Sequence, residues 1–351
     1  MTAQSSRPRR FGADFVEAHR HRYGKRPPQD RQLTYDIAVQ DEHAAWRQWL
    51  DDQLALLPDQ SSEALAKKVW LDEHFWPVNF ELATGAGLRA AGLRTVYEEV
   101  WDGLSPDWAV LSDSGTPLAF VEFHTDMPAP ETFGQMRAWH GLVERIKEIP
   151  VPVLLQLASA KPVSPPDPRT AKRIAQDLRR ELLSGRPGST FWTQGYTFLV
   201  MQDPRREVAA KLGMHACFDP PSSRAGSVTA QRLMEGITEK VRKYKNLAAR
   251  YEVPLIVAVG AHRFTGVTLQ QLDDVLTGLP APKITFQFNA GDPFIGQQTV
   301  NMAPVPPWEW PGDLSGLLWI ANQLPFDLTG RPNPAAQRRM PAALMASRAG
   351  R

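Results

Sequence analysis

The chain has 351 residues, of which 42% are hydrophobic, enough to fill the core of one large domain or two ordinary ones. Its 40 basic and 38 acidic residues leave a formal charge of +2, which by itself does not indicate a nucleic-acid partner. The single cysteine, Cys217, excludes an internal disulfide, and no run of about 18 apolar residues predicts a membrane-spanning helix. Because the first residues lack an apolar signal stretch, we expect a cytoplasmic protein with no membrane partner.

Both ends of the chain are basic. Residues 1–31 hold eight Lys or Arg against three acids, and residues 328–351 hold five Arg and no acid. Such ends could bind phosphates through counterion release, but solvated termini are also commonly basic for no such reason. Charge therefore leaves both interpretations open, and it says nothing about the oligomeric state.

The first half of the chain is predicted to change from helical to extended and back. Apolar residues at helical spacing begin it, and short apolar runs separated by turn-forming residues follow. In chain order we expect a helix at 33–57, a second helix from residue 61 through 82, strands at 95–101, 108–111 and 118–125, a helix at 131–148 and a strand at 151–157. The spacing of the last three predicts a βαβ unit, with strand 151–157 parallel to strand 118–125.

The second half repeats the alternation behind a proline-rich loop at 161–168. In chain order we expect a helix at 169–183, a strand at 196–201, a long helix at 230–251, a strand at 255–259, a helix at 269–276, a strand at 284–288 and an irregular tail after Pro332. These elements predict an α/β protein in three parts. The parts are a basic arm and N-terminal helix over 1–60, a core over 61–160, and a C-terminal α/β lobe over 161–351, which could be continuous with the core.

The candidate metal-binding residues lie on and beside the strand expected at 118–125. Side chains alternate between its faces, so Glu122 and His124 share one face while Val121 and Phe123 point the other way. Asp107 lies 15 residues before Glu122, at the start of the preceding strand, and the turn-forming residues 112–115 predict a hairpin that brings the two carboxylates together. Two carboxylates are ligands that a hard cation such as Mg²⁺ prefers.

This pattern resembles the PD-(D/E)xK, or restriction endonuclease-like, superfamily. The matching positions are Asp107 in Ser105-Pro106-Asp107-Trp108, Glu122 in Phe120-Val121-Glu122-Phe123-His124, and the helical Glu81 in Asn79-Phe80-Glu81-Leu82. The resemblance implies an αβββαβ core, a Mg²⁺ or Mn²⁺ ion held by Asp107 and Glu122 with help from Glu81, and hydrolysis of DNA phosphodiesters. His124 stands where the family has its catalytic lysine.

More narrowly, the chain is similar to a bacterial group of such proteins over much of residues 75–341. The later signs are Ile237-Thr238-Glu239-Lys240-Val241-Arg242-Lys243-Tyr244 ahead of Pro254-Leu255-Ile256-Val257-Ala258-Val259, and Asn333-Pro334-Ala335. Members of that group often lack the lysine too. The resemblance then leaves a second function open, a catalytically inactive nuclease fold that binds nucleic acid or a protein partner.

Each candidate residue also has an ordinary structural explanation. Asp107 follows a proline at a strand start, where aspartate often caps a turn, and Glu81 could be a helical surface acid. Glu122 lies among apolar residues, where an unpaired acid is costly, so it needs either a metal or an ion pair. His124 could ligate a metal, act as a general base and position the attacking water, or be a hydrogen-bonded residue in a degenerate site.

A lysine for the site could also come from another element. The helix expected at 230–251 carries Lys240, Lys243 and Lys245, and Lys240 lies one turn before Tyr244. We assign Lys240 and Lys243 as candidate contacts to nucleic acid, with an ordinary solvated basic face as the alternative.

Overall fold

The computed structural model describes residues 9–127, 130–158, 163–184, 189–202, 215–220, 230–261, 267–278, 283–287, 297–301, 304, 306–345 and 348–349. The chain divides into two compact units. Unit 1 comprises residues 1–86, 127–227 and 264–266, and unit 2 comprises residues 87–126, 228–263 and 267–351. The boundaries expected after residues 60 and 160 both fall inside unit 1, and they stay predictions about independently folding domains.

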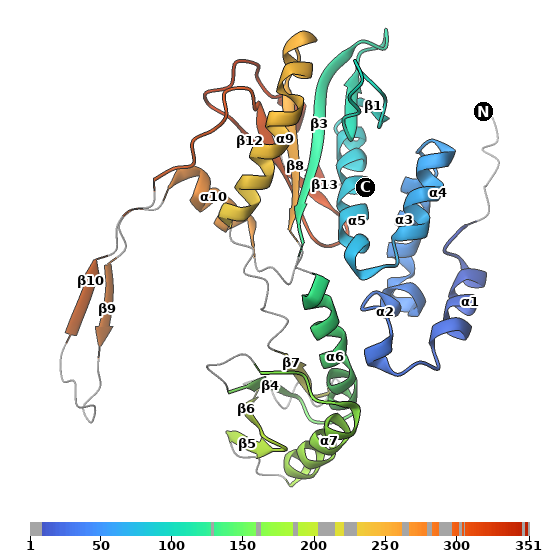
Figure 1. Ribbon diagram of the computed structural model, residues 1–351, viewed down its shortest axis with the longest axis vertical. Helices are drawn as coiled ribbons and strands as arrows, with labels where there is room; N and C mark the ends of the chain where they lie inside the picture. Colours follow the sequence, from blue (N-terminus) through green and yellow to red (C-terminus); the bar gives the residue numbers. More distant parts are fainter. Residues whose placement is uncertain are drawn as a thin grey trace. The chain divides into compact units, whose positions relative to one another are not determined.

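Unit 2 is built on a seven-stranded mixed sheet (Figure 1). Its order is β1-β2-β3-β8-β11-β12-β13. The strands are β1 (Arg94–Tyr97), β2 (Trp108–Leu111), β3 (Pro117–Asp126), β8 (Leu255–Ala261), β11 (Gly316–Ile320), β12 (Asp327–Pro332) and β13 (Arg348–Ala349). The first three form the expected antiparallel meander, and β8 lies parallel to both β3 and β11. All seven residues of β8 are buried, as is usual for a strand between two parallel neighbours.

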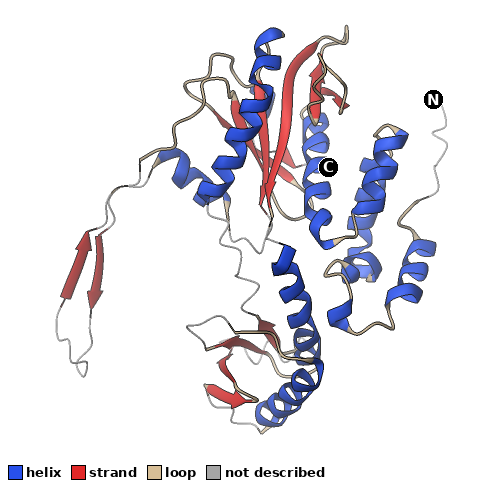
Figure 2. Cartoon of the chain, in the orientation of Figure 1, coloured by secondary structure: helices blue, strands red, loops and turns tan. Residues whose placement is uncertain are grey.

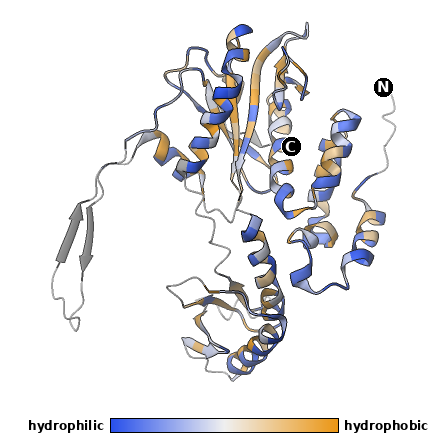
Figure 3. Ribbon diagram, viewed as in Figure 1, coloured by the Kyte–Doolittle hydropathy of each residue, from blue (hydrophilic) through white to orange (hydrophobic). Residues whose placement is uncertain are grey.

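Helix α9 (Ala230–Arg250) packs on β3 and β8, and Figure 1 shows it running along them. Its apolar side chains recur at helical spacing and are buried in one cluster with residues of the sheet. They are Leu233, Met234, Ile237, Val241, Tyr244, Leu247 and Ala248. The opposite side of the helix is charged, and Figure 3 shows both hydropathy colours along its length. This amphipathic pattern explains why the helix forms and which face it buries.

Three further pieces complete unit 2. Helix α10 (Leu269–Thr277) begins with a capping box between Thr268 and Gln271. Strands β9 (Lys283–Gln287) and β10 (Gln297–Asn301) form a separate antiparallel pair, and η4 (Ala342–Leu344) is a short 3₁₀ turn in the tail. Within the described residues after Pro332, the chain is otherwise irregular, as expected, except for the two-residue strand β13.

The expected partner of β3 was wrong. Strand β4 (Val153–Leu157) belongs to a second sheet of order β5-β6-β4-β7, where it pairs antiparallel with β6 and parallel with β7. The parallel neighbour of β3 is β8, more than a hundred residues later in the chain. The physical reason is burial, because β8 is apolar on both faces whereas β4 alternates and is covered on one face by helices.

The second sheet lies in unit 1, with its other strands at β5 (Thr190–Thr193), β6 (Tyr196–Gln202) and β7 (Cys217–Asp219). Helices α6 (Pro130–Lys147) and α7 (Pro168–Leu183), blue in Figure 2, contribute to its core. Trp139, Ile174 and Phe198 are buried in that core. Asp167 caps α7 by accepting bonds from the backbone N–H groups of Arg169 and Thr170. The strands that the sequence did not predict are β5, β7, β10, β11, β12 and β13.

The N-terminal part of unit 1 is helical. It contains α1 (Ala13–Tyr23), η1 (Pro28–Asp30), α2 (Tyr35–Val39), η2 (Asp41–His43), α3 (Ala44–Leu54), α4 (Asp59–Lys68) and α5 (Asp72–Ala90), whose last four residues belong to unit 2. The single helix expected at 33–57 breaks at Gln40, which is extended. The Arg47 side chain donates to the carbonyls of Ile37 and Gln40 and so satisfies acceptors that this break exposes.

Across the residues described, no helix is both long enough and apolar enough to cross a bilayer.

Candidate functional site

The meander of unit 2 brings Asp107 and Glu122 together. The antiparallel register of β2 and β3 sets Trp108 opposite Val121, so the residue before Trp108 lies beside the residue after Val121. The Asp107 N–H donates to Glu122 Oε1 at 3.1 Å, and the Phe123 N–H donates to Asp107 Oδ2 at 2.6 Å. Each carboxylate is therefore held by a backbone amide of the neighbouring segment, which fixes both side chains at one end of the hairpin.

A lysine reaches the same place from α9. Lys240 Nζ lies 2.7 Å from Glu122 Oε2 and 3.4 Å from Asp107 Oδ2. The Lys240 side chain is 28% exposed, that of Asp107 is 21% exposed, and that of Glu122 is fully buried. From the sequence, Lys240 was predicted to contact nucleic acid. In the structure its ammonium lies against the two carboxylates.

The electrostatics follow from burial and from the excess of acid. Burial raises the pKa of Glu122 to about 7, with a further contribution from Asp107, while Lys240 opposes the shift. Burial also acts to lower the pKa of Lys240, but Asp107 and Glu122 outweigh it and raise that pKa. Two carboxylates thus share one ammonium, and if both are ionised one negative charge in this group is uncompensated.

Tyr244 lies one helical turn beyond Lys240 and helps to hold the loop before Asp107. Its hydroxyl donates to the Ser105 carbonyl at 2.9 Å, and its side chain is buried. Burial raises its pKa, and Glu122 and Asp107 add to the effect, so the phenol stays protonated. Lys243 is exposed, with its Nζ 4.6 Å from the centre of the Tyr244 ring. The one-turn spacing of Lys240 and Tyr244 was the sequence signal for this arrangement.

His124 lies on the same face of β3 but plays a different part. Its Nε2 is buried and has no hydrogen-bond partner within the described part of the chain. The ring packs against α9 at Gly236, where a Cβ would come within 2.1 Å of Nε2. Burial lowers the pKa of His124 to about 4, and Lys240 and Arg232 add to the shift. The imidazole is therefore neutral near pH 7, and Gly236 is needed to make room for it.

The remaining candidate, Glu81, lies on α5 within unit 1, whereas Asp107, Glu122, His124 and Lys240 belong to unit 2. Its role stays a prediction.

Among the described residues, three potential metal ligands lie close together in unit 1, with ligand atoms within 4.8 Å of one another. They are Asp36, His140 and Glu144. Asp107, Glu122 and His124 do not form such a group, so any ion at this site would rest on the two carboxylates.

Family models, curated proteins and solved structures were each compared with the chain, and none of the three comparisons found a match.

Proposed function

We propose that the chain is a PD-(D/E)xK-like protein that hydrolyses DNA phosphodiesters with Mg²⁺ or Mn²⁺, and that Lys240 takes the part of the lysine missing from β3. The observation that carries the proposal is the approach of Lys240 Nζ to both Glu122 and Asp107, at 2.7 and 3.4 Å.

The order of elements supports the proposal. Helix α5 is followed by the antiparallel strands β1, β2 and β3, then by α9, and then by β8 parallel to β3. This is the αβββαβ order that the resemblance implies, with the unit 1 segment 127–227 inserted between β3 and α9. The insertion explains why the sequence assigned α6 and β4 to the positions that α9 and β8 occupy in this order.

The donor set fits a hard divalent cation. Asp107 and Glu122 supply carboxylate oxygens, and the raised pKa of Glu122 reflects burial and repulsion that a further positive charge would relieve. When bound there, Mg²⁺ or Mn²⁺ would polarise a phosphate and lower the pKa of a coordinated water. Lys240, charged and close to both acids, would bind the negative oxygens of the substrate and orient the attacking water. His124, which is neutral, would serve as packing beside Gly236 rather than as a permanent cation.

The second candidate is a nuclease fold without catalysis that binds nucleic acid or a protein partner. The Lys240 ion pair favours it, because an ammonium already compensates part of the carboxylate charge without any metal.

Cleavage of supercoiled plasmid in Mg²⁺ or Mn²⁺ tests the first proposal, and calorimetric titration with Mn²⁺ separates it from the second. We expect cleavage by the wild type and at least a hundredfold slower cleavage by Glu122→Gln, because the carboxylate is lost at nearly constant shape. Glu99→Gln, which changes an exposed acid outside the site, is the matched control. Equal cleavage by wild type and Glu122→Gln would contradict catalysis at this site, and absence of Mn²⁺ uptake would favour the inactive module.

A further inference from the structure

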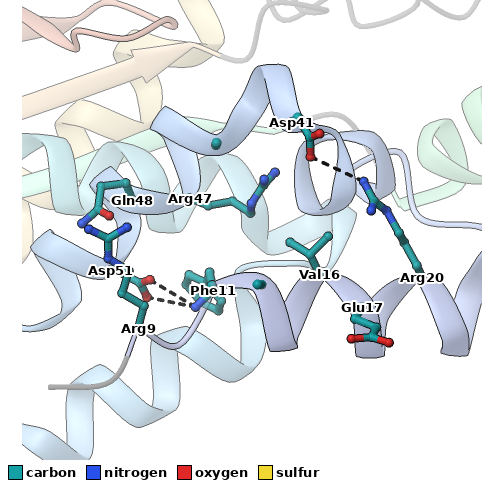
Figure 4. Close-up of a pocket in the computed structure, with 12 residues that line it drawn as sticks. Arg9, Phe11, Val16, Glu17, Arg20, Asp41, Arg47, Gln48 and Asp51 are labelled. Carbon is teal, nitrogen blue, oxygen red and sulfur yellow. Dashed lines mark hydrogen bonds and ion pairs between the residues drawn. The ribbon is translucent and has the colours of Figure 1, made fainter.

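A cavity of about 640 Å³ lies between α1 and the start of α3 in unit 1 (Figure 4). Val16 of α1 and Arg47 of α3 reach into it from opposite walls, and Arg20 and Asp41 lie at one end with Arg9, Gln48 and Asp51 at the other. The volume falls within the range of about 300 to 1,000 Å³ that is usual for small-molecule sites. The site discussed above lies in unit 2 and shares no residue with this cavity.

The Arg47 side chain is the central polar group of the cavity. The residue is only 6% exposed, and its Nη1 donates to the carbonyls of Ile37 and Gln40 at 2.9 and 2.7 Å. Its Nε and Nη2 donors have no acceptor among the residues that the structure describes. Burial lowers the pKa of Arg47, and Arg20 adds to the effect while Asp41 opposes it. A buried guanidinium with unused donors at a cavity wall is suited to a planar or tetrahedral oxyanion.

None of the acids around the cavity, as far as the structure describes them, accepts a hydrogen bond from Arg47, so a ligand could do so. Both oxygens of Asp51 accept the backbone N–H of Phe11, at 3.3 and 3.1 Å, so this acid already has a structural task. The Asp41 side chain is 95% exposed and lies 3.6 Å from Arg20, where water screens it. Arg9 and Arg20 lie at the two ends, and Glu17 is an exposed acid on the α1 wall, so three arginines and three acids line the cavity. Among the residues that the structure describes, no carboxylate forms an ion pair with Arg47.

We propose that this cavity binds a small organic anion whose carboxylate or phosphate is held by Arg47. The Nε and Nη2 donors of Arg47 bind the oxyanion, Arg9 and Arg20 close around it, and the apolar wall formed by Val16 and Ala13 contacts the remainder of the ligand. This activity is independent of hydrolysis at the site in unit 2.

Calorimetric titration of the full chain with inorganic phosphate and, separately, with succinate tests the proposal. We expect one-to-one binding of at least one probe, and the probe that binds identifies the ligand as phosphate-like or carboxylate-like. Ala44→Phe places a ring in the cavity from an exposed position, and it is expected to raise the Kd at least tenfold. Ala45→Phe, also exposed but outside the cavity, is the matched control and should leave the Kd unchanged.

Arg47→Lys keeps the charge but removes the two-pronged donor, so it should also raise the Kd at least tenfold. If this variant fails to fold because it loses its bonds to Ile37 and Gln40, Ala44→Phe still tests the site. No heat from either probe with the wild type would overturn the proposal. A Kd for Ala44→Phe within threefold of the wild type would overturn it too, because binding would then occur elsewhere.

Discussion

Two buried carboxylate groups, one in each unit, are held in different ways. In unit 1, Asp72 is buried, and its Oδ2 lies 2.7 Å from Arg137 Nη1 while its Oδ1 accepts the Leu33 N–H at 2.7 Å. In unit 2, Glu122 shares the single ammonium of Lys240 with Asp107. Burial raises the pKa of both Asp72 and Glu122, so a shifted pKa does not distinguish them.

The difference lies in the balance of charge. Asp72 has one cation and an amide for its other oxygen, which is a complete set of partners for a structural acid. Among the described residues, Asp107 and Glu122 have one cation between them. When both acids are ionised, the excess negative charge is what a divalent cation would neutralise. A buried acid therefore indicates a possible ligand site when its partners do not fully compensate its negative charge.

The largest expected difference concerns catalysis. Lys240→Met should lower the rate of Mn²⁺-dependent plasmid cleavage about 10²- to 10⁴-fold, because the group that orients the water and binds the phosphate is lost. Lys245→Met, an exposed lysine of the same helix, should cleave like the wild type. Arg137→Met should also retain its rate below its melting temperature. Comparable losses for Lys240→Met and Lys245→Met would show that only overall charge matters.

For the free energy of unfolding, the substitution in unit 1 should have a large effect, although it should not change the cleavage rate. Arg137→Met leaves Asp72 buried without a cation and is expected to lower the free energy of unfolding by about 3 to 5 kcal/mol, measured by urea unfolding followed by circular dichroism. Arg180→Met, which removes an exposed pair with Asp177, should cost less than about 1 kcal/mol. A small loss for Arg137→Met would mean that Asp72 is stabilised by its backbone bonds alone.

Metal binding at the proposed site should stabilise the protein through the acids of unit 2. With free Mn²⁺ at a hundred times its Kd, the wild type should gain about 2.7 kcal/mol in the free energy of unfolding, seen as a rise in melting temperature. Glu122→Gln should lose this gain, whereas Asp72→Asn should keep it from a lower starting stability. Retention of the full Mn²⁺ effect in Glu122→Gln would place the metal elsewhere.

The smallest effect concerns His124 and pH. The pKa of His124 in the folded state, about 4, lies below its ordinary value of 6.5. Its contribution to the free energy of unfolding is therefore present above pH 6.5 and is lost as the pH falls toward 4. Relative to His124→Gln, the wild type should therefore lose about 2 kcal/mol between pH 7 and pH 5.

The wild type must be compared with His124→Gln at each pH, because Glu122, present in both, changes the free energy of unfolding with pH in the opposite direction. With a folded pKa of about 7 against an ordinary 4.5, its contribution is present below pH 4.5 and is lost as pH rises through 7. Urea unfolding of both proteins at the two pH values measures the difference. A difference that does not change with pH would show that His124 is solvated in the folded state.

The local pattern of the sequence sufficed for much of the fold and part of the site. Apolar periodicity located α6, α7, α9, β2, β3 and β8 within a few residues, because side-chain period is a property of neighbours in the chain. Strand alternation put Glu122 and His124 on one face, and the turn-forming residues 112–115 predicted the hairpin that joins Asp107 to Glu122. The α/β class was confirmed, while the specific nuclease-like core stays a prediction.

Contacts between residues far apart in the chain could not be predicted from the local sequence pattern. Which strand lies beside β3 depends on a long-range choice between β4 and β8, and either is compatible with local spacing. The same choice brings α9 over β3 and so carries Lys240 to Glu122, 118 residues away, rather than leaving it on a solvated basic face. Pairing between distant segments is set by which apolar faces can be buried together, and a one-dimensional pattern does not encode that choice.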